Sequence, residues 1–493
     1  MIYLGIDLGT SNVKILATNE DGNILGVSCQ DYPIYHPQPG WAEQNPEDWW
    51  DATLKALESL CQQEFINPLE IQSIGFSGQM HGLVMLDQQG QVLHPALLWC
   101  DQRTSNECEI ISQHFSLDAL KKTVSNQVAT GFTAPKILWI KRNKPELFEK
   151  IAHILLPKDY IRFKLSGHFA TDFSDASGML LLDIKNKKWS KEMCNFLKIK
   201  ENWLPELYES YEITGIVKLD LCKKFGLKEF VLLVAGAGDQ AAGAVGTSTI
   251  IDGRVSVTLG TSGVVFASLN HFKADENLVL HSFCHANGKY HFMGVMLSAA
   301  NSLKWWSENV HNGTDIDLLL QEAEIEYTNH SKIIFLPYLM GERTPHSNPY
   351  STGTFIGLTP TSTRGQMTKA ILEGVAFGLL DSLKLLESEN VVIDEIRMIG
   401  GGAKSRLWQQ ILTDIFGKPV YRVNSTQGSA LGAAILAMVG AGIFNTVEEA
   451  SEHIVKKCSP TYPNQEHKSH YHNQYKRFQK LYASLENWYY DNN

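Results

Sequence analysis

The chain makes the turn LGTS twice, each time directly after an apolar run that is typical of a β-strand. The first copy lies in MIYLGIDLGTSNVKI at residues 1–15, and the second lies in VSVTLGTSGVVFA at residues 255–267. Two similar hairpins so far apart in one chain indicate an internal repeat. Because 493 residues are also too many for one core, we expect two domains, residues 1–247 and 248–493.

The first hundred residues combine strand and helix signals. After two β-rich runs, Asn45 is a suitable N-cap, Pro46 suits the first helical position, and Glu47 and Asp48 complement the helix dipole. The segment IQSIGFSGQMHGLVMLD at 71–87 then returns to strand, turn and strand. Sheets covered by helices are therefore expected, which is an α/β architecture.

Composition excludes several classes of protein. Apolar residues make up 44% and charged residues 19%, which is typical of a soluble globular chain. A net charge of −10 argues against nucleic-acid and anionic-membrane partners. The eight cysteines contain no CxxC pair and the N-terminus has no signal-peptide pattern, so we expect reduced thiols in a cytoplasmic protein. The uncharged stretch 428–444 has roughly membrane-helix length, but its glycines favour a buried helix.

Three glycine turns are candidate phosphate sites. Thr10 and Ser11 in the first LGTS turn, and Gly260 and Thr261 in the second, offer amides and hydroxyls to phosphate oxygens. A single copy would more often be a plain hairpin, but two copies in corresponding places favour one polyphosphate held from both sides. GGGAKS at 400–405 ends a strand before a helix and suits a nucleotide, or else is a packing turn. Neither a P-loop nor a GxGxxG dinucleotide motif is present.

Two aspartates stand at the ends of apolar strands. Asp7 precedes only the first LGTS turn and is predicted to hold Mg²⁺ through water, with a turn-capping aspartate as the alternative. Asp239 follows Gly236-Ala237-Gly238 and is predicted to be the general base of a phosphoryl transfer. It could equally be the N-cap of the next helix. The predicted metal residues are Asp7 and Asp239.

Polar residues in two turns are candidates for binding a small polar substrate. GQMHG at 78–82 offers Gln79 and His81, and WCDQRT at 99–104 offers Trp99, Asp101 and Arg103. Each stretch alone could be an ordinary surface loop. The tail motif HKSHYH at 467–472 is more typical of a solvated segment than of a metal site.

With these motifs in hand, the chain resembles the FGGY carbohydrate kinases over nearly its whole length. GFTAPKILWIKRN at 131–143 and GTFIGLTPTSTRGQMTKAILE at 353–373 fit the two family signatures. Four further motifs resemble those of the family's xylulokinase branch: GQMHG, LLPKDY, FLPYLMGERTPHSNP and SALGAA. An Arg-Glu pair, typical of glycerol kinases, would stand where Met80 and His81 are.

The resemblance implies two actin-like (ribonuclease H-like) domains with a cleft between them, sugar mainly on the N-terminal half and ATP mainly on the C-terminal half. It implies that Asp239 is the proton acceptor and that Asp7 is associated with the metal, which would be Mg²⁺. Met80 and His81 match the sugar-contacting pair, and Gln240 follows the base where many xylulokinases have Asn. Further residues match the second phosphate turn and the adenosine-side turn: Gly260, Thr261, Gly401, Gly402 and Ser405.

The function implied is transfer of phosphate from ATP to the C5 hydroxyl of D-xylulose. The nearest alternative is a family member that acts on another pentulose or a polyol, such as ribulose or L-xylulose. An actin-like ATPase of the assembly or chaperone type would share the phosphate turns but not GQMHG or the two signatures. A binding module without catalysis is disfavoured by the two aspartates at the turns. A homodimer is an expectation from the family alone.

Overall fold

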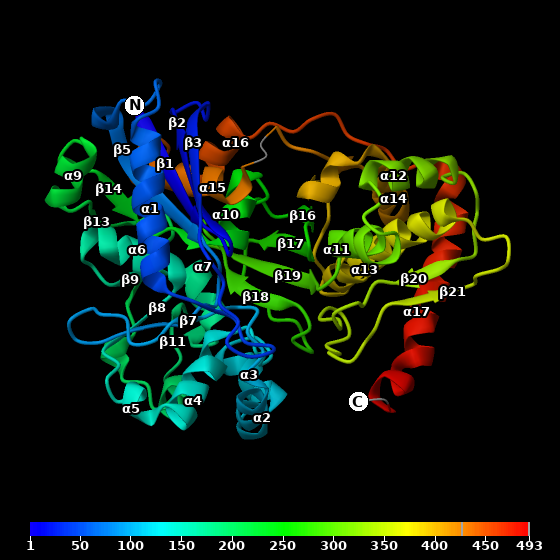
Figure 1. The fold of residues 1–493 in the computed structure, drawn as a ribbon, viewed down its shortest axis with the longest axis horizontal. Coiled ribbons are helices and arrows are strands. Elements are labelled where there is room, and N and C mark those ends of the chain that lie inside the picture. The colour runs from blue at the N-terminus through cyan, green and yellow to red at the C-terminus, as the bar shows by residue number, and fades with distance from the viewer. Residues whose placement is uncertain (425–426, 492–493) are drawn as a thin grey trace.

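Two β-sheets form the core of the computed structural model, which describes residues 1–424 and 427–491. In Figure 1 the first sheet lies at the left, and the second lies in the middle, with the long C-terminal helix α17 (Lys468–Asp491) along the right edge. The two predicted hairpins are confirmed, because β1 pairs with β2 and β16 pairs with β17, both antiparallel. The strands of the two sheets are β1 (Ile2–Leu8), β2 (Asn12–Thr18), β3 (Ile24–Asp31), β5 (Ile71–Gly78), β13 (Ile213–Ile216), β14 (Leu232–Val234), β15 (Ala237–Gly238), β16 (Arg254–Leu259), β17 (Gly263–Leu269), β18 (His281–Cys284), β19 (Tyr290–Met296), β22 (Glu395–Ile399) and β23 (Val420–Tyr421).

The two sheets share one topology. In the first, the antiparallel strands β3, β2 and β1 lead into β5 and β14, which run parallel to β1. In the second, the antiparallel strands β19, β17 and β16 lead into the parallel β22 and β23. Parallel strands bring their carboxyl ends to one edge of a sheet, where open α/β sheets bind ligands. The LGTS turns follow β1 and β16 at those edges.

Helices cover both sheets. Helix α1 begins at Pro46 and Asn45 caps it, as predicted. The helices are α1 (Pro46–Cys61), α2 (Ser105–His114), α3 (Leu117–Thr123), α4 (Thr133–Asn143), α5 (Pro145–Phe148), α6 (Pro157–Ser166), α7 (Phe173–Ala176), α8 (Lys191–Leu197), α9 (Leu219–Phe225), α10 (Asp239–Gly246), α11 (Ala300–Trp305), α12 (Ile316–Ile325), α13 (Arg364–Ser388), α14 (Arg406–Phe416), α15 (Gly428–Gly440), α16 (Val447–Ile454) and α17. Short strands outside the two sheets are β4 (Glu43–Gln44), β6 (Val84–Leu86), β7 (Ala96–Leu97), β8 (His153–Leu155), β9 (Ala170–Asp172), β10 (Leu182–Asp183), β11 (Lys188–Trp189), β12 (Glu206–Tyr208), β20 (Ile334–Leu336) and β21 (Thr354–Ile356).

Helix α15 comes from the second half of the chain but packs on the first sheet. A Cβ added to Gly5 of β1 would lie 1.9 Å from the carbonyl oxygen of Ala430, and one added to Gly432 would lie 1.8 Å from the carbonyl oxygen of Ala242 in α10. Glycine is therefore needed at both positions, because backbone meets backbone there. Figure 1 shows α15 and α16, in orange, beside the blue strands. The division at residues 247 and 248 stays a proposal, and the packing crosses it.

The uncharged stretch at 428–444 proves to be this buried helix, as expected. Helix α15 has 13 residues, and ten of them are buried, from Ala430 to Val439. Within residues 1–424 and 427–491 we find no helix with both the length and the apolar character needed to cross a membrane.

Aromatic and imidazole rings fill one face of the second sheet. His291 of β19 is 1% exposed and stacks on Phe266 of β17, with ring centroids 4.1 Å apart. His285 meets both rings edge-on. Burial, reinforced by the neighbouring His285 and His281, holds the pKa of His291 well below its ordinary value. This imidazole is therefore neutral in the folded protein at neutral pH.

Stability is expected to fall on acidification because of such buried imidazoles. Below pH 6.5 the unfolded chain protonates His291 while the folded chain does not, so each pH unit costs up to about 1.4 kcal/mol per group. In His291→Phe, the ring stacking is kept and the free energy of unfolding should depend less steeply on pH between 6.5 and 5. Urea unfolding at several pH values measures this, with exposed His36→Phe as the control. Identical slopes in the wild type and His291→Phe would contradict the prediction.

Candidate active site

Asp7 and Asp239 lie close enough to influence each other. Asp7 is the last residue but one of β1, and Asp239 follows β15 as the first residue of α10. Burial raises the pKa of Asp239 to about 7, with the negative charge of Asp7 as the second cause, and hydrogen bonds from Gln240 offset part of this. The structure therefore brings together the two carboxylates that the sequence predicts. Gln240 sits beside the carboxylate of Asp239, in the first turn of the same helix.

The surroundings of Asp7 suit a hydrated cation. Its Oδ1 is buried, and burial raises the pKa of the carboxyl group. The nearby Ser77 hydroxyl offsets part of this rise in the pKa. Its geometry is not that of a hydrogen bond, so Asp7 Oδ1 has no hydrogen-bond partner among the described residues. Two nearby carboxylates, one with an unsatisfied oxygen, match the oxygen donors that Mg²⁺ prefers. The residues present therefore fit the predicted metal.

The turn Gln79–Met80–His81 lies between these carboxylates at the end of β5. The Gln79 amide N–H donates to the carbonyl oxygen of Leu8 over 2.8 Å, which ties the turn to the end of β1. Met80 packs on Gly238, where an added Cβ would lie 2.9 Å from Met80 Cγ. Because Gly238 immediately precedes the candidate base, the predicted sugar-binding turn and the base form one wall.

The first LGTS turn contacts the predicted sugar-binding loop directly. Trp99 is 41% exposed and its Nε1–H donates to Thr10 Oγ1 over 3.1 Å. The carbonyl oxygen of Ser11 accepts the amide N–H of Tyr32. Ser11 is exposed at the turn. Thr10 and Trp99 thus link the predicted phosphate and sugar regions.

Gln44 supports both regions, although no motif in the sequence marks it. Its Nε2 donates to the carbonyl oxygen of Thr10 over 2.7 Å, while its Oε1 accepts from Gln79 Nε2 at 2.9 Å and from Trp49 Nε1 at 3.0 Å. Gln44 is fully buried. A polar residue just before a capped helix carries no signal of this role, because the contact with Gln79 depends on the fold.

Asp101 and Arg103 form a buried ion pair behind Trp99. Arg103 Nη2 lies 2.7 Å from Asp101 Oδ2, Nη1 lies 2.7 Å from Glu43 Oε1, and the guanidinium stacks over the ring of Trp41. The Arg103 side chain is only 1% exposed. Contact with a sugar stays a prediction for this pair; the observed contacts hold the loop that carries Trp99.

A buried ionic cluster also reaches the backbone next to the base. Lys158 Nζ lies 2.7 Å from Asp159 Oδ1 and 2.9 Å from Asp172 Oδ1. Asp172 Oδ2 accepts the Ser174 hydroxyl at 2.5 Å, and Ser174 Oγ accepts the amide N–H of Gly238 at 3.2 Å. This network positions the residue before Asp239. Its only trace in the sequence is the motif LLPKDY, which contains Lys158 and Asp159.

The two glycine turns of the second half are neighbours. Strands β16 and β22 run parallel, with Thr258 opposite Ile399, so the Gly260–Thr261 turn lies beside GGGAKS. The carbonyl oxygen of Thr261 accepts the amide N–H of Ala299 at 2.9 Å, which anchors that turn to the start of α11.

The GGGAKS segment lies between β22 and α14, as predicted. Gly400 has a φ of +89°, and an added Cβ at Gly402 would lie 2.9 Å from Leu259 Cβ, whereas space around Gly401 is open. A 3-10 turn, Gly401–Lys404, precedes α14, whose N-cap is Ser405. Because the Ser405 hydroxyl accepts the amide N–H of Trp408, the helix begins one residue after the glycine turn and not within it.

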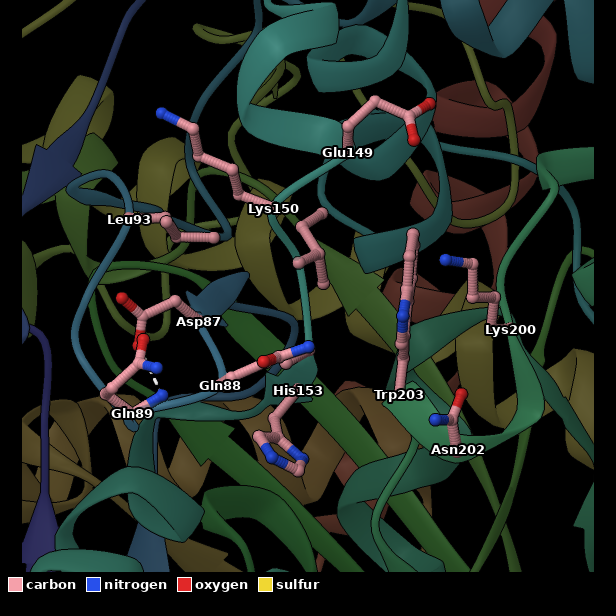
Figure 2. Close-up of a pocket in the computed structure, with 12 residues that line it drawn as sticks. Asp87, Gln88, Gln89, Leu93, Glu149, Lys150, His153, Lys200, Asn202 and Trp203 are labelled. Carbon is pink, nitrogen blue, oxygen red and sulfur yellow. Dashed lines mark hydrogen bonds between the residues drawn. The ribbon is translucent and has the colours of Figure 1, made fainter.

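Cavity size does not point to these residues. A cavity of about 540 Å³ between α5, β8 and the chain near Trp203 is lined by Leu93, Glu149, His153 and others (Figure 2). None of the predicted site residues lines it. The candidate site is therefore identified by its chemistry and strand-end position.

Comparisons with known proteins identify the family. The sequence profile of the FGGY family of carbohydrate kinases, N-terminal domain, matches residues 2–246, and the C-terminal domain profile matches residues 255–441. The chain belongs to the FGGY family of carbohydrate kinases. The predicted family and the predicted α/β fold of two actin-like domains are thereby confirmed.

Relatives cover this FGGY kinase from end to end. The xylulose kinase of Escherichia coli is 38% identical over 486 residues, which are 98% of this chain and 99% of the relative. The crystal structure of a xyloylose kinase from Brucella ovis has a TM-score of 0.94 at 36% identity and covers 99% of both chains. That of a gluconate kinase from Lactobacillus acidophilus has a TM-score of 0.93 at 24% identity, with 98% of both chains covered, and shows the shared fold alone.

Proposed function

We propose that the protein is a D-xylulose kinase, which transfers the γ-phosphoryl group of MgATP to the C5 hydroxyl of D-xylulose. The products are D-xylulose 5-phosphate and ADP. The observation that carries the proposal is the single wall formed by Asp239, Gly238, Met80 and His81, in a chain 38% identical to a xylulose kinase over its whole length. The chain shares its fold with a gluconate kinase, so the fold alone does not determine which sugar is the substrate. The residues of the site must determine it.

In the proposed mechanism, Asp239 accepts the proton of the C5 hydroxyl as its oxygen attacks the γ-phosphorus. The bond from that phosphorus to the ADP oxygen breaks. The transition state of phosphoryl transfer is loose, so alignment and charge stabilisation contribute most of the rate. Asp7 would hold Mg²⁺ through water, with Asp239 as the second metal residue, and the bound cation would supply positive charge that stabilises the phosphate oxygens. Thr10, Ser11, Gly260 and Thr261 are proposed to hold those oxygens from both sides.

The remaining candidate residues are divided between the sugar and the nucleotide. Met80, His81 and Gln79, with Trp99 and Gln240, are proposed to line the sugar site, and Gly401, Gly402 and Ser405 the adenosine side. All eight cysteines are free thiols, which supports a cytoplasmic location because that compartment keeps thiols reduced. Assembly as a homodimer rests on the family expectation.

The test is ADP release from MgATP with D-xylulose, D-ribulose, L-ribulose, L-xylulose, glycerol or no sugar. We expect D-xylulose to give the highest kcat/KM by at least about tenfold, the discrimination that one well-made hydrogen bond provides. A higher value for another sugar would leave the kinase mechanism intact and reject the substrate. Equal ADP release with and without sugar would instead indicate an ATPase and reject the proposal.

A further inference from the structure

Arg343 lies in the segment FLPYLMGERTPHSNP, and its backbone is firmly held at the end of β19. The Arg343 amide N–H donates to Glu342 Oε1 over 2.7 Å, and the same oxygen accepts the amide N–H of Leu297 at 3.0 Å. The Thr344 amide N–H donates to the carbonyl oxygen of Val295 over 2.9 Å. The carboxylate of Glu342 is thus used on the backbone, and the Arg343 side chain starts from a fixed point.

The guanidinium of Arg343 reaches across to the first half of the chain. Its Nη2 lies 3.9 Å from the position that a Cβ on Gly131 would occupy. The ammonium group of Lys136 donates to the carbonyl oxygens of both Gly131, at 2.6 Å, and His81, at 2.9 Å. Arg343 is also among the charges that lower the pKa of His81. The cation therefore sits beside the turn that carries His81.

Arg343 has no ion-pair or hydrogen-bond partner for its side chain within residues 1–424 and 427–491. Burial lowers its pKa. Arg343 is partly buried, so its guanidinium is neither fully withdrawn from water nor engaged by a protein acceptor. A guanidinium that lies between the two halves of an enzyme without a protein partner is available to donate to the acceptor oxygens of a ligand. Guanidinium can only donate, through a planar fork.

His81 presents the complementary group. Its Nδ1 lies 2.6 Å from the carbonyl oxygen of Gly178, and because a carbonyl can only accept, Nδ1 carries the hydrogen. Burial lowers the pKa of His81 to about 3, so the ring is neutral and Nε2 is an acceptor. The ring of Phe132 meets it edge-on at 5.0 Å. An acceptor nitrogen therefore belongs to a ring that lies within the electrostatic reach of the donor-only guanidinium of Arg343.

This pair matches the α-hydroxyketone end of a ketose, which offers a hydroxyl donor and, next to it, a carbonyl that can only accept. We propose that Arg343 determines specificity by donating hydrogen bonds to the C2 carbonyl oxygen of the ketose, while His81 accepts from a neighbouring hydroxyl. The proposal rests on the proposed function. Met80 lies between Gly238 and His81 along this wall, so a sugar with its C5 hydroxyl at the base extends its C1–C2 end toward His81 and Arg343. The flat carbonyl suits the planar fork better than the tetrahedral carbon of a polyol does.

The test compares Arg343→Met with the wild type on D-xylulose and on xylitol, in which the C2 carbonyl is a hydroxyl. Loss of hydrogen bonds from a charged donor should lower kcat/KM for D-xylulose about 10- to 100-fold, mainly through KM. With xylitol we expect a change below about threefold, so the ketose-to-polyol ratio collapses. Arg364→Met is the matched control, since Arg364 pairs with Glu322 at the surface.

A second variant guards against a merely structural effect. Arg343→Ala should recover part of its D-xylulose activity when methylguanidine is added at millimolar concentration, which a packing defect would not do. Equal losses with both sugars and no rescue, or a fall in kcat with D-xylulose affinity unchanged, would overturn the proposal. If the wild type phosphorylates D-xylulose but Arg343→Met leaves the ratio of kcat/KM for D-xylulose to that for xylitol unchanged, only this inference is rejected. A wild type that uses no ketose rejects the proposed function and this inference with it.

Discussion

Asp239→Asn is expected to lower kcat about 10²- to 10⁴-fold, the usual contribution of a general base. The amide cannot accept the proton of the C5 hydroxyl, and Asp7, the neighbouring carboxylate, is assigned to the metal. The affinity for D-xylulose should change by less than about threefold, because Asn has the same shape and can still hydrogen-bond. Single-turnover kinetics with MgATP measure the loss, and calorimetric titration measures sugar binding.

Folding should not confound that result. The raised pKa of Asp239 shows that its charge is unfavourable in the folded state, so the variant should be at least as stable as the wild type. Asp220→Asn is the matched control, because Asp220 also lies in the first turn of a helix, α9, but is exposed. An Asp239→Asn enzyme that keeps a tenth of wild-type turnover would rule out the base assignment.

Asp7→Asn is expected to raise the Mg²⁺ concentration needed for half-maximal turnover at least about tenfold and to lower kcat about 100-fold or more. Asn keeps the size of Asp7 but loses the negative charge that would attract the hydrated cation. Mg²⁺ titration of steady-state turnover measures the first effect. Sugar affinity without nucleotide should stay unchanged, because Asp7 is assigned to the metal.

The control for Asp7 is Asp31→Asn, at the exposed end of β3 in the same sheet. It should leave the Mg²⁺ dependence as in the wild type. If Asp7→Asn and the wild type have the same Mg²⁺ dependence, Asp7 caps its turn and does not hold the metal, which is the alternative that the sequence left open.

Local signals account for what could be predicted. The hairpins after β1 and β16, the helix that begins at Pro46, and the strand-end positions of Asp7 and Asp239 depend on alternation, caps and glycine turns within a few residues. Such features follow from backbone geometry and local hydrogen bonding, which a sequence displays directly. The segment GGGAKS follows a strand and precedes α14, as predicted, and the structure adds that the Ser405 hydroxyl caps this helix.

Contacts between distant segments account for what was missed. Asp101 and Arg103 stay candidates for sugar contact, but the sequence did not connect them with Glu43 and Trp41, which enclose the arginine. Gln44 looked unremarkable, yet it joins Thr10 to Gln79. In each case the partner lies many residues away, and burial decides whether a polar side chain faces a ligand or another side chain.

By itself the sequence determined that two α/β halves open with matching LGTS turns and that Asp7 and Asp239 stand at strand ends, since these features depend on short-range pattern. Only the tertiary structure decided that α15 returns to pack on the first sheet through Gly5 and Gly432. It also decided that His81 is neutral with Nε2 as the acceptor and that Arg343 of the other half reaches Gly131, close enough for its charge to act on His81. Those outcomes depend on which backbones can approach closely and which charges are left without partners, and both are properties of the assembled fold.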